Sequence, residues 1–275
     1  MTYWKKLSKD KSNQLADIRS QLHKSTQLVA LAARGQLPES KEDKYASLIW
    51  NTEKKLLVSQ FFGDQKNIQT AIDFSSFSLV VLVEEIIYQS FDLNNKTIDE
   101  ALNWLKGVLQ KLLIDTSSLS LKLPYKFLED LLPGDQLHIE NTDISSELTI
   151  WFDNTFNVLN SFKQNKSKTP DIWIWPHHFD IAMLWELPEG KSIGMGLSPG
   201  DKYIANPYYY ISPYPYPNKK DLHEIKPIVG NWHTEDWTGL VLNSSEVLKE
   251  TAELEENIVF DFLKNGFDIS IKLLK

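Results

Sequence analysis

The chain has 275 residues, enough for one or two domains, and its 42% hydrophobic and 24% charged residues exclude a disordered protein. A net charge of −8 argues against a nucleic-acid-binding surface, and Arg19 and Arg34 are the only arginines available for forked contacts with phosphate. The absence of cysteine excludes disulfides, thiolate metal sites and a cysteine nucleophile.

Neither a membrane span nor a secretion signal is expected. The most apolar stretch, residues 74–87, is interrupted by Glu84 and Glu85 and falls short of the roughly 20 apolar residues that span a bilayer. The opening residues, MTYWKKLSKDKSNQ, are too polar for the apolar segment of a secretory signal. We therefore expect a cytoplasmic protein with neither a membrane nor a nucleic-acid partner.

The first half of the chain predicts a helix, three strands and a second helix. Apolar residues spaced by three and four indicate a helix over 12–34, and Gly35 follows it. Thr97 and Glu100 form a capping box that opens a helix with a long apolar stripe. The strands are expected at residues 45–50, 56–62 and 77–83.

The second half begins with helical signals and then becomes rich in proline and tryptophan. A short helix is expected from Pro124 to Pro133-Gly134, and an amphipathic helix over 145–163. A last helix is expected from Ser245 to Asn265, ended by Gly266. The strands between these helices are expected at residues 171–175, 177–187, 191–197, 207–212 and 238–242.

This order of elements favours an α+β fold with mixed or antiparallel sheets and amphipathic helices, because strands and helices do not alternate strictly. We place the halves at 1–120 and 121–275 and expect them to form one compact unit. The segments "FDLNNKTIDEALNWL" and "LVLNSSEVLKETAEL" correspond in position, so two related halves are a further hypothesis.

Residues 196–200, Gly-Leu-Ser-Pro-Gly, match the Gly-x-Ser-x-Gly pattern of serine hydrolases. The chemistry does not fit, because the oxyanion hole needs an N–H on the residue after the serine and Pro199 has none. No helical pattern follows Ser198 either. We predict a type II turn centred on Pro199 and Gly200.

A possible metal site involves two histidines and an aspartate. If residues 177–187 form one strand, His178 and Asp180 share its outward face, while Phe179 and Ile181 face the core. His233 could supply a third ligand to a divalent ion, although no specific metal-binding spacing is present. The alternative is that these side chains only form turns and bond to nearby backbone.

The run Pro207–Pro217, PYYYISPYPYP, is the chain's most unusual segment. As a strand it places Tyr208 and Tyr210 on one face and Tyr209 and Ile211 on the other. Its tail lacks three backbone donors, so we expect it to leave the sheet or to form an edge. Phenol rings suit a ring-shaped ligand or a partner surface, but the favoured interpretation of this segment is an aromatic lid over the core, with its hydroxyls reaching water.

Several motifs occur in an order that resembles a bacterial family known as a domain of unknown function. They are "LHKSTQLV" (22–29), "DFSSF" (73–77), "HHFDIA" (177–182), "SIGMGLSPGD" (192–201) and "NPYYYISPYPYP" (206–217). Members of that family show a Leu-His-x-x-x-Gln helix, a Phe-Asp strand, a Pro-Gly-Asp turn and a Pro-x-Phe-Tyr strand. The resemblance covers nearly the whole chain.

The resemblance implies no activity, but it points to His23, Gln27, Asp180 and Asp201 by motif match. His23 and Gln27 are four residues apart and share a helix face. Many family members lack histidines matching His177 and His178 and a serine matching Ser198. This departure counts against a metal or hydrolase site.

Our leading hypothesis is a small-molecule-binding cleft in the second half of the chain, without a cofactor. No motif assigns a reaction. One alternative is a metal-dependent hydrolase using His178, Asp180 and His233; another is an interaction or scaffold protein that pairs through the tyrosine-rich strand. The residues expected to line the cleft are Asp180, Asp201, Tyr208, Tyr210 and Trp232, together with His23 and Gln27.

Overall fold

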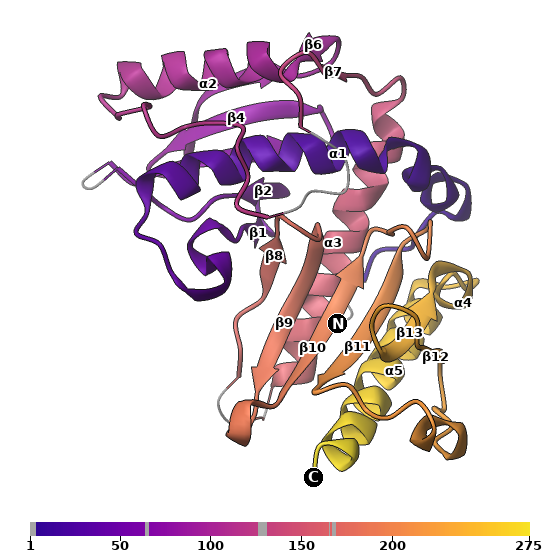
Figure 1. Ribbon diagram of the computed structural model, residues 1–275. Coiled ribbons are helices and arrows are strands. Elements are labelled where there is room, and N and C mark those ends of the chain that lie inside the picture. Colours follow the sequence, from indigo (N-terminus) through magenta and orange to yellow (C-terminus); the bar gives the residue numbers. More distant parts are fainter. Residues whose placement is uncertain (1–3, 64–65, 126–130, 165, 167–168) are drawn as a thin grey trace. The chain divides into compact units, whose positions relative to one another are not determined.

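A computed structural model describes residues 4–63, 66–125, 131–164, 166 and 169–275 (Figure 1). All the strand pairs described are antiparallel, and the fold is α+β as predicted. The helices are α1 (Lys9–Gln36), α2 (Ile98–Lys111), α3 (Thr142–Lys163), α4 (Ser244–Val247) and α5 (Ala252–Leu273), with 3-10 turns η1 (Lys41–Ala46), η2 (Pro188–Gly190) and η3 (Asp221–Glu224). The strands are β1 (Ile49–Asn51), β2 (Leu56–Val58), β3 (Ile68–Asp73), β4 (Ser78–Val83), β5 (Ile86–Asp92), β6 (Lys96–Thr97), β7 (Gln136–Leu137), β8 (Trp173–Trp175), β9 (Asp180–Glu186), β10 (Ser192–Ser198), β11 (Tyr208–Tyr214), β12 (Asn231–His233) and β13 (Gly239–Asn243).

Contacts between Cα atoms divide the chain into two compact units. The terminal unit comprises Met1–Ala16, Ile150–Trp173 and Asp180–Lys275, and the middle unit comprises Asp17–Thr149 and Ile174–Phe179. Both α1 and α3 contribute residues to both units. The expected halves, 1–120 and 121–275, stay a prediction, and the contact units follow a different division.

The middle unit is built on a five-stranded meander in the order β1-β2-β3-β4-β5. Helix α1 packs on the sheet, where the Thr70 hydroxyl donates to the Val29 carbonyl at 3.0 Å. Helix α2 opens with the predicted Thr97–Glu100 capping box, and its Trp104 ring stacks on Phe91 of β5 at 5.1 Å. Because the strand register puts Thr70 and Phe91 on one face, both helices pack on the same side of this sheet.

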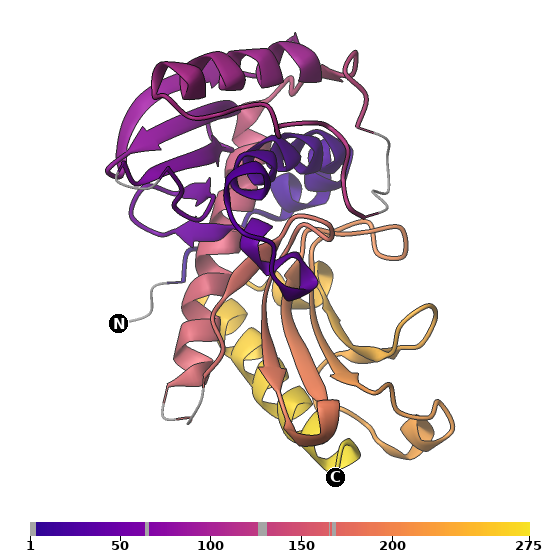
Figure 2. The same cartoon turned by 60° about the vertical axis from the view of Figure 1, so that its left-hand side comes forward.

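The terminal unit is built on a sheet with the strand order β12-β13-β11-β10-β9-β8. Tyr209 donates to or accepts from Thr155 of α3 at 2.9 Å, and Ile211 packs closely on Gly266 of α5. These two residues of β11 share a face, so α3 and α5 cover the same side of the sheet, as Figure 2 shows. We call the opposite side, which carries neither α3 nor α5, the outer face.

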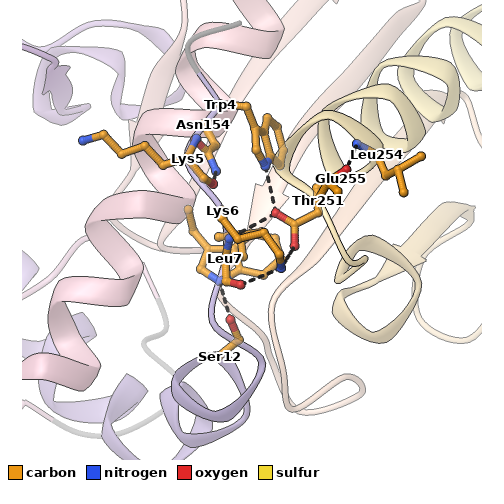
Figure 3. A network of polar contacts seen from close by, with 10 residues as sticks. Trp4, Lys5, Lys6, Leu7, Ser12, Asn154, Thr251, Leu254 and Glu255 are labelled. Atoms are coloured by element: carbon orange, nitrogen blue, oxygen red, sulfur yellow. Dashed lines mark hydrogen bonds and ion pairs between the residues drawn. The ribbon is translucent and has the colours of Figure 1, made fainter.

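Residues 4–7 are held within the terminal unit chiefly by one buried carboxylate (Figure 3). Glu255 of α5 is fully buried and accepts from the Trp4 indole at 3.1 Å, the Leu7 amide at 3.0 Å and the Lys6 ammonium at 2.6 Å. Asn154 of α3 adds a two-way pair with the backbone of Lys5, in which both distances are 2.8 Å. Residues 4–7 are thus held by two helices that lie far along the chain.

Two predicted strands begin later than their patterns indicate. Residues 176–179 form a turn, with Phe179 in a left-handed conformation at φ 60°, and β9 begins only at Asp180. The prediction that His178 and Asp180 share a strand face was therefore wrong, because the turn takes His178 out of the strand. Likewise Tyr45 and Ala46 lie in η1, and the strand there is shortened to β1.

The last helix does not end at Gly266 but continues to Leu273. A Cβ atom at Gly266 would lie 2.4 Å from Ile211 Cδ1, so this glycine serves close helix–sheet packing and not a helix end. Strands β3, β5, β6, β7 and β12 lay outside the predicted set. The centre of the helix predicted from Pro124, residues 126–130, lies outside the described residues.

The tyrosine-rich strand is central in its sheet from Tyr208 to Ile211. Its tail behaves as predicted, because Pro213 and Tyr214 pair with β10 alone and residues 215–217 lie outside the sheet. β11 pairs with β10 along its whole length and with β13 from Tyr208 to Ile211. Pro213 has no N–H to donate. The pairing of β11 with β13 ends at Ile211, so Pro213 loses no hydrogen bond to β13.

Candidate aromatic site on the outer face

Five rings follow one another across the outer face, and we call them the aromatic row. Their centroids are separated by 6.4 Å (Tyr208–Tyr210), 6.2 Å (Tyr210–Trp237), 4.4 Å (Trp237–His233) and 5.3 Å (His233–Tyr203). Tyr208 is buried at one end, and the other four rings are half-buried. The row therefore has accessible ring surface at four residues and a buried ring, that of Tyr208, at one end.

Both tyrosines of β11 in the row donate their hydroxyls to carboxylates. Tyr208 donates to Asp201 at 2.8 Å, and Tyr210 donates to Asp180, which is only 6% exposed. Asp201 also accepts from the amides of Tyr203 and Ile204, so the turn after β10 holds this carboxylate in place. These bonds fix the orientation of both phenol rings.

The two phenols remain protonated at neutral pH. Burial, followed by the charge of Asp201, raises the pKa of Tyr208, and burial, followed by the charge of Asp180, raises the pKa of Tyr210. Both groups therefore act as hydrogen-bond donors to their carboxylates and do not act as bases.

The far end of the row carries the third carboxylate. Asp236 accepts from the Tyr203 hydroxyl and from the Lys202 ammonium, the latter at 2.8 Å. The same ammonium lies 4.5 Å from the centroid of the Tyr203 ring. A cation thus sits over a ring and beside a carboxylate at this end of the site.

Glycines allow close packing beside the row at two points. Gly196 lies opposite Tyr210 in the ladder, and a Cβ atom there would lie 2.2 Å from the Ile181 carbonyl oxygen. Gly239 lies opposite His233, and a Cβ atom there would lie 2.7 Å from the Trp237 ring. Side chains at these positions would displace the neighbouring strand or the Trp237 ring.

His233 presents a polar atom within the row. Its ring lies between those of Trp237 and Tyr203. The Nε2 atom is buried, and it has no hydrogen-bond partner among the residues that the structure describes. Sequence reasoning singled out His233 as a metal ligand but missed Tyr203, Asp236 and Trp237; the dense "WHTEDW" run was the available signal.

His23 and Gln27 belong to the middle unit, where they hold the turn before β9. His23 Nε2 and Gln27 Nε2 each donate to the Pro176 carbonyl at 2.7 Å. The His23 ring also stacks on Phe179 with centroids 5.1 Å apart, and Tyr125 donates to Gln27 Oε1 at 2.5 Å. The Leu-His-x-x-x-Gln motif therefore places two donors on one carbonyl.

The His23 side chain is disfavoured as a cation in this setting. Burial, and then the neighbouring His178, Arg19 and His177, lower its pKa from 6.5 to about 4 against the opposing effect of the Pro176 hydrogen bond. At neutral pH it is a neutral donor that supports the turn.

Several predicted site residues do not join the aromatic row. Trp232 points to the opposite face, because it pairs with Leu240 and its indole donates to the Ile225 carbonyl at 2.8 Å. No group of three or more His, Asp or Glu residues in the described part of the chain could hold a metal ion, so His178, Asp180 and His233 do not form the predicted ligand set.

Ser198 ends β10 and is followed by a bend, with Gly200 at φ 111° and no helix. Its hydroxyl accepts from the Gly200 amide at 3.2 Å. This agrees with the rejection of a nucleophile elbow, which requires a helix after the serine.

No family model, curated protein or solved structure matches the chain. The resemblance to a domain of unknown function stays a prediction from the motifs. Within the described residues, no helix is long and apolar enough to cross a membrane.

Proposed function

We propose that the protein binds a small molecule that carries a flat ring, and that the aromatic row is the binding surface. The observation that carries this proposal is the unbroken run of five rings, four of them half-buried, on a sheet face without α3 or α5. Ligand sites combine aromatic surface with a few placed polar groups. Here the polar groups are the Tyr210 hydroxyl and His233 Nε2.

The row is also well prepared to bind. Tyr208 and Tyr210 are held by hydrogen bonds to Asp201 and Asp180. A surface whose side chains are already ordered loses less entropy when a ligand binds. A location in the cytoplasm, without nucleic-acid or membrane partners, stays a prediction from the sequence.

The proposal is tested by screening soluble ring compounds with saturation-transfer NMR on the intact protein. We expect weak binders whose affinity falls about tenfold or more in Trp237→Leu, since stacking and buried area are lost together. Tyr88→Leu is the matched control, because Tyr88 is 45% exposed on β5 of the middle unit. A screen without binders, or equal losses in both variants, would contradict the proposal.

A further inference from the structure

We infer that the aromatic row prefers an organic cation, such as an alkylated ammonium attached to a ring, over neutral and anionic ligands. This inference rests on the proposed function and adds the charge of the ligand. Its basis is that three carboxylates lie directly behind or beside the rings: Asp201 at Tyr208, Asp180 at Tyr210, and Asp236 at Tyr203.

The balance of charge along the row is negative. Among the described contacts of the row, the cation is the ammonium of Lys202, which is paired with Asp236. A surface with this balance attracts cations and repels carboxylates and phosphates.

The hydrogen bonds strengthen the attraction of the rings themselves. A phenol that donates to a carboxylate is polarised, so electron density on its oxygen and ring rises. The face of such a ring attracts a cation through its quadrupole, most strongly where water is partly excluded. Tyr208 is 4% exposed, and Tyr210 and Trp237 are half-buried.

Lys202 shows the arrangement that we expect for the ligand. Its ammonium lies over the Tyr203 ring at 4.5 Å while it pairs with Asp236 at 2.8 Å. Tyr210, beside Trp237 and bonded to Asp180, offers the same combination of ring and carboxylate. The Tyr210 and Trp237 ring planes meet at 73°, in an edge-to-face arrangement.

His233 offers the ligand a hydrogen-bond acceptor. Its buried Nε2 lies in the ring next to Trp237 and has no partner among the described residues. A neutral imidazole nitrogen accepts a hydrogen bond from a hydroxyl or an ammonium N–H. A cation that also carries such a donor would satisfy this atom.

The test compares three ring probes of similar size: benzyltrimethylammonium, benzyl alcohol and benzoate. Affinities for the intact protein are measured by NMR titration at low and high salt. We expect benzyltrimethylammonium to bind about tenfold more tightly than benzyl alcohol, benzoate to bind weakest, and the preference to shrink with salt. Asp180→Asn should lower the affinity for the cation several-fold more than the affinity for benzyl alcohol, because it removes charge and keeps an acceptor for Tyr210.

Asp92→Asn, an exposed position on β5, is the matched control and should change neither affinity. Equal binding of the cation and the alcohol at the row would overturn the charge preference and leave ring binding in place. Loss of all ring probes from the row would overturn both proposals. Tyr210→Phe gives a second readout, because it keeps the ring but removes the bond to Asp180, and it should reduce the preference for the cation.

Discussion

At the scale of single residues, the residues to which the family resemblance points have different structural roles. Asp180 and Asp201 orient tyrosines of the aromatic row, whereas His23 and Gln27 both hold the Pro176 carbonyl. Two donors on one carbonyl fix the turn that precedes β9. The motifs behind that resemblance therefore serve two separate structural tasks.

The depressed pKa of His23 predicts a dependence of stability on pH. Its pKa is about 4 in the folded protein against 6.5 for the free side chain, so the unfolded chain binds the proton more tightly between these values. The folded state therefore has its full stability above pH 6.5 and loses about 3 kcal/mol from this residue as the pH falls to 4.

His23→Gln removes this titration and keeps an N–H donor. We expect the free energy of unfolding, measured by urea titration between pH 7 and 4, to fall less steeply in the variant than in the parent. His138→Gln is the control, because His138 is exposed. Parallel curves for parent and His23→Gln would contradict the prediction.

At the scale of elements, buried contacts determine where helices run and what they hold. Gly266 permits α5 to pass over Ile211, so the helix continues where a glycine often ends one. The same helix carries Glu255, whose carboxylate gathers three donors from residues 4–7. Glu255, a buried acidic residue with three hydrogen-bond partners, therefore anchors the N-terminal segment.

Glu255→Ala is expected to lower the free energy of unfolding by about 3–5 kcal/mol, because it leaves the Lys6 ammonium and two buried N–H groups without their acceptor. Glu253→Ala, an exposed change on the same helix, should cost far less. Urea unfolding of both variants gives the comparison. Equal, small losses would show that the carboxylate does not anchor the segment.

The elements most readily predicted are those whose local sequence agrees with their packing. The apolar stripe and the Thr97–Glu100 box indicated α2, and alternation indicated the two faces of β11. The turn at 176–179 was missed because Phe179 continues the alternation of Ile181 and Met183 while its backbone is left-handed. Hydrophobic alternation predicts which side chains are buried, but it does not predict whether the backbone that buries them is a strand or a turn.

At the scale of the whole molecule, the two units repeat one arrangement, in which two helices pack on one face of an antiparallel sheet. Each unit draws on separated chain segments, so neither corresponds to a continuous half. A true duplication of sequence stays a prediction. The repeated arrangement does predict that each unit has its own core and its own local stability.

Phe262→Ala in α5 and Leu82→Ala in β4 test this, since both side chains are at most 1% exposed and each truncation should cost about 2–5 kcal/mol. We expect Phe262→Ala to reduce amide-exchange protection mainly in β10 and β11, and Leu82→Ala mainly in β3 and β4. Hydrogen exchange followed by mass spectrometry locates the loss. A uniform loss in both variants would mean that the two units open together.

The sequence by itself determined the α+β class, the amphipathic helices, the alternating faces of the tyrosine-rich strand and the rejection of a serine nucleophile. These follow from local periodicity, capping and the chemistry of Pro199. The tertiary structure alone decided that β11 is central, that Trp232 points away from Tyr210, and that Trp237, His233 and Tyr203 extend the row. Strand order and register depend on pairings between distant segments, and no local pattern encodes which segments those are.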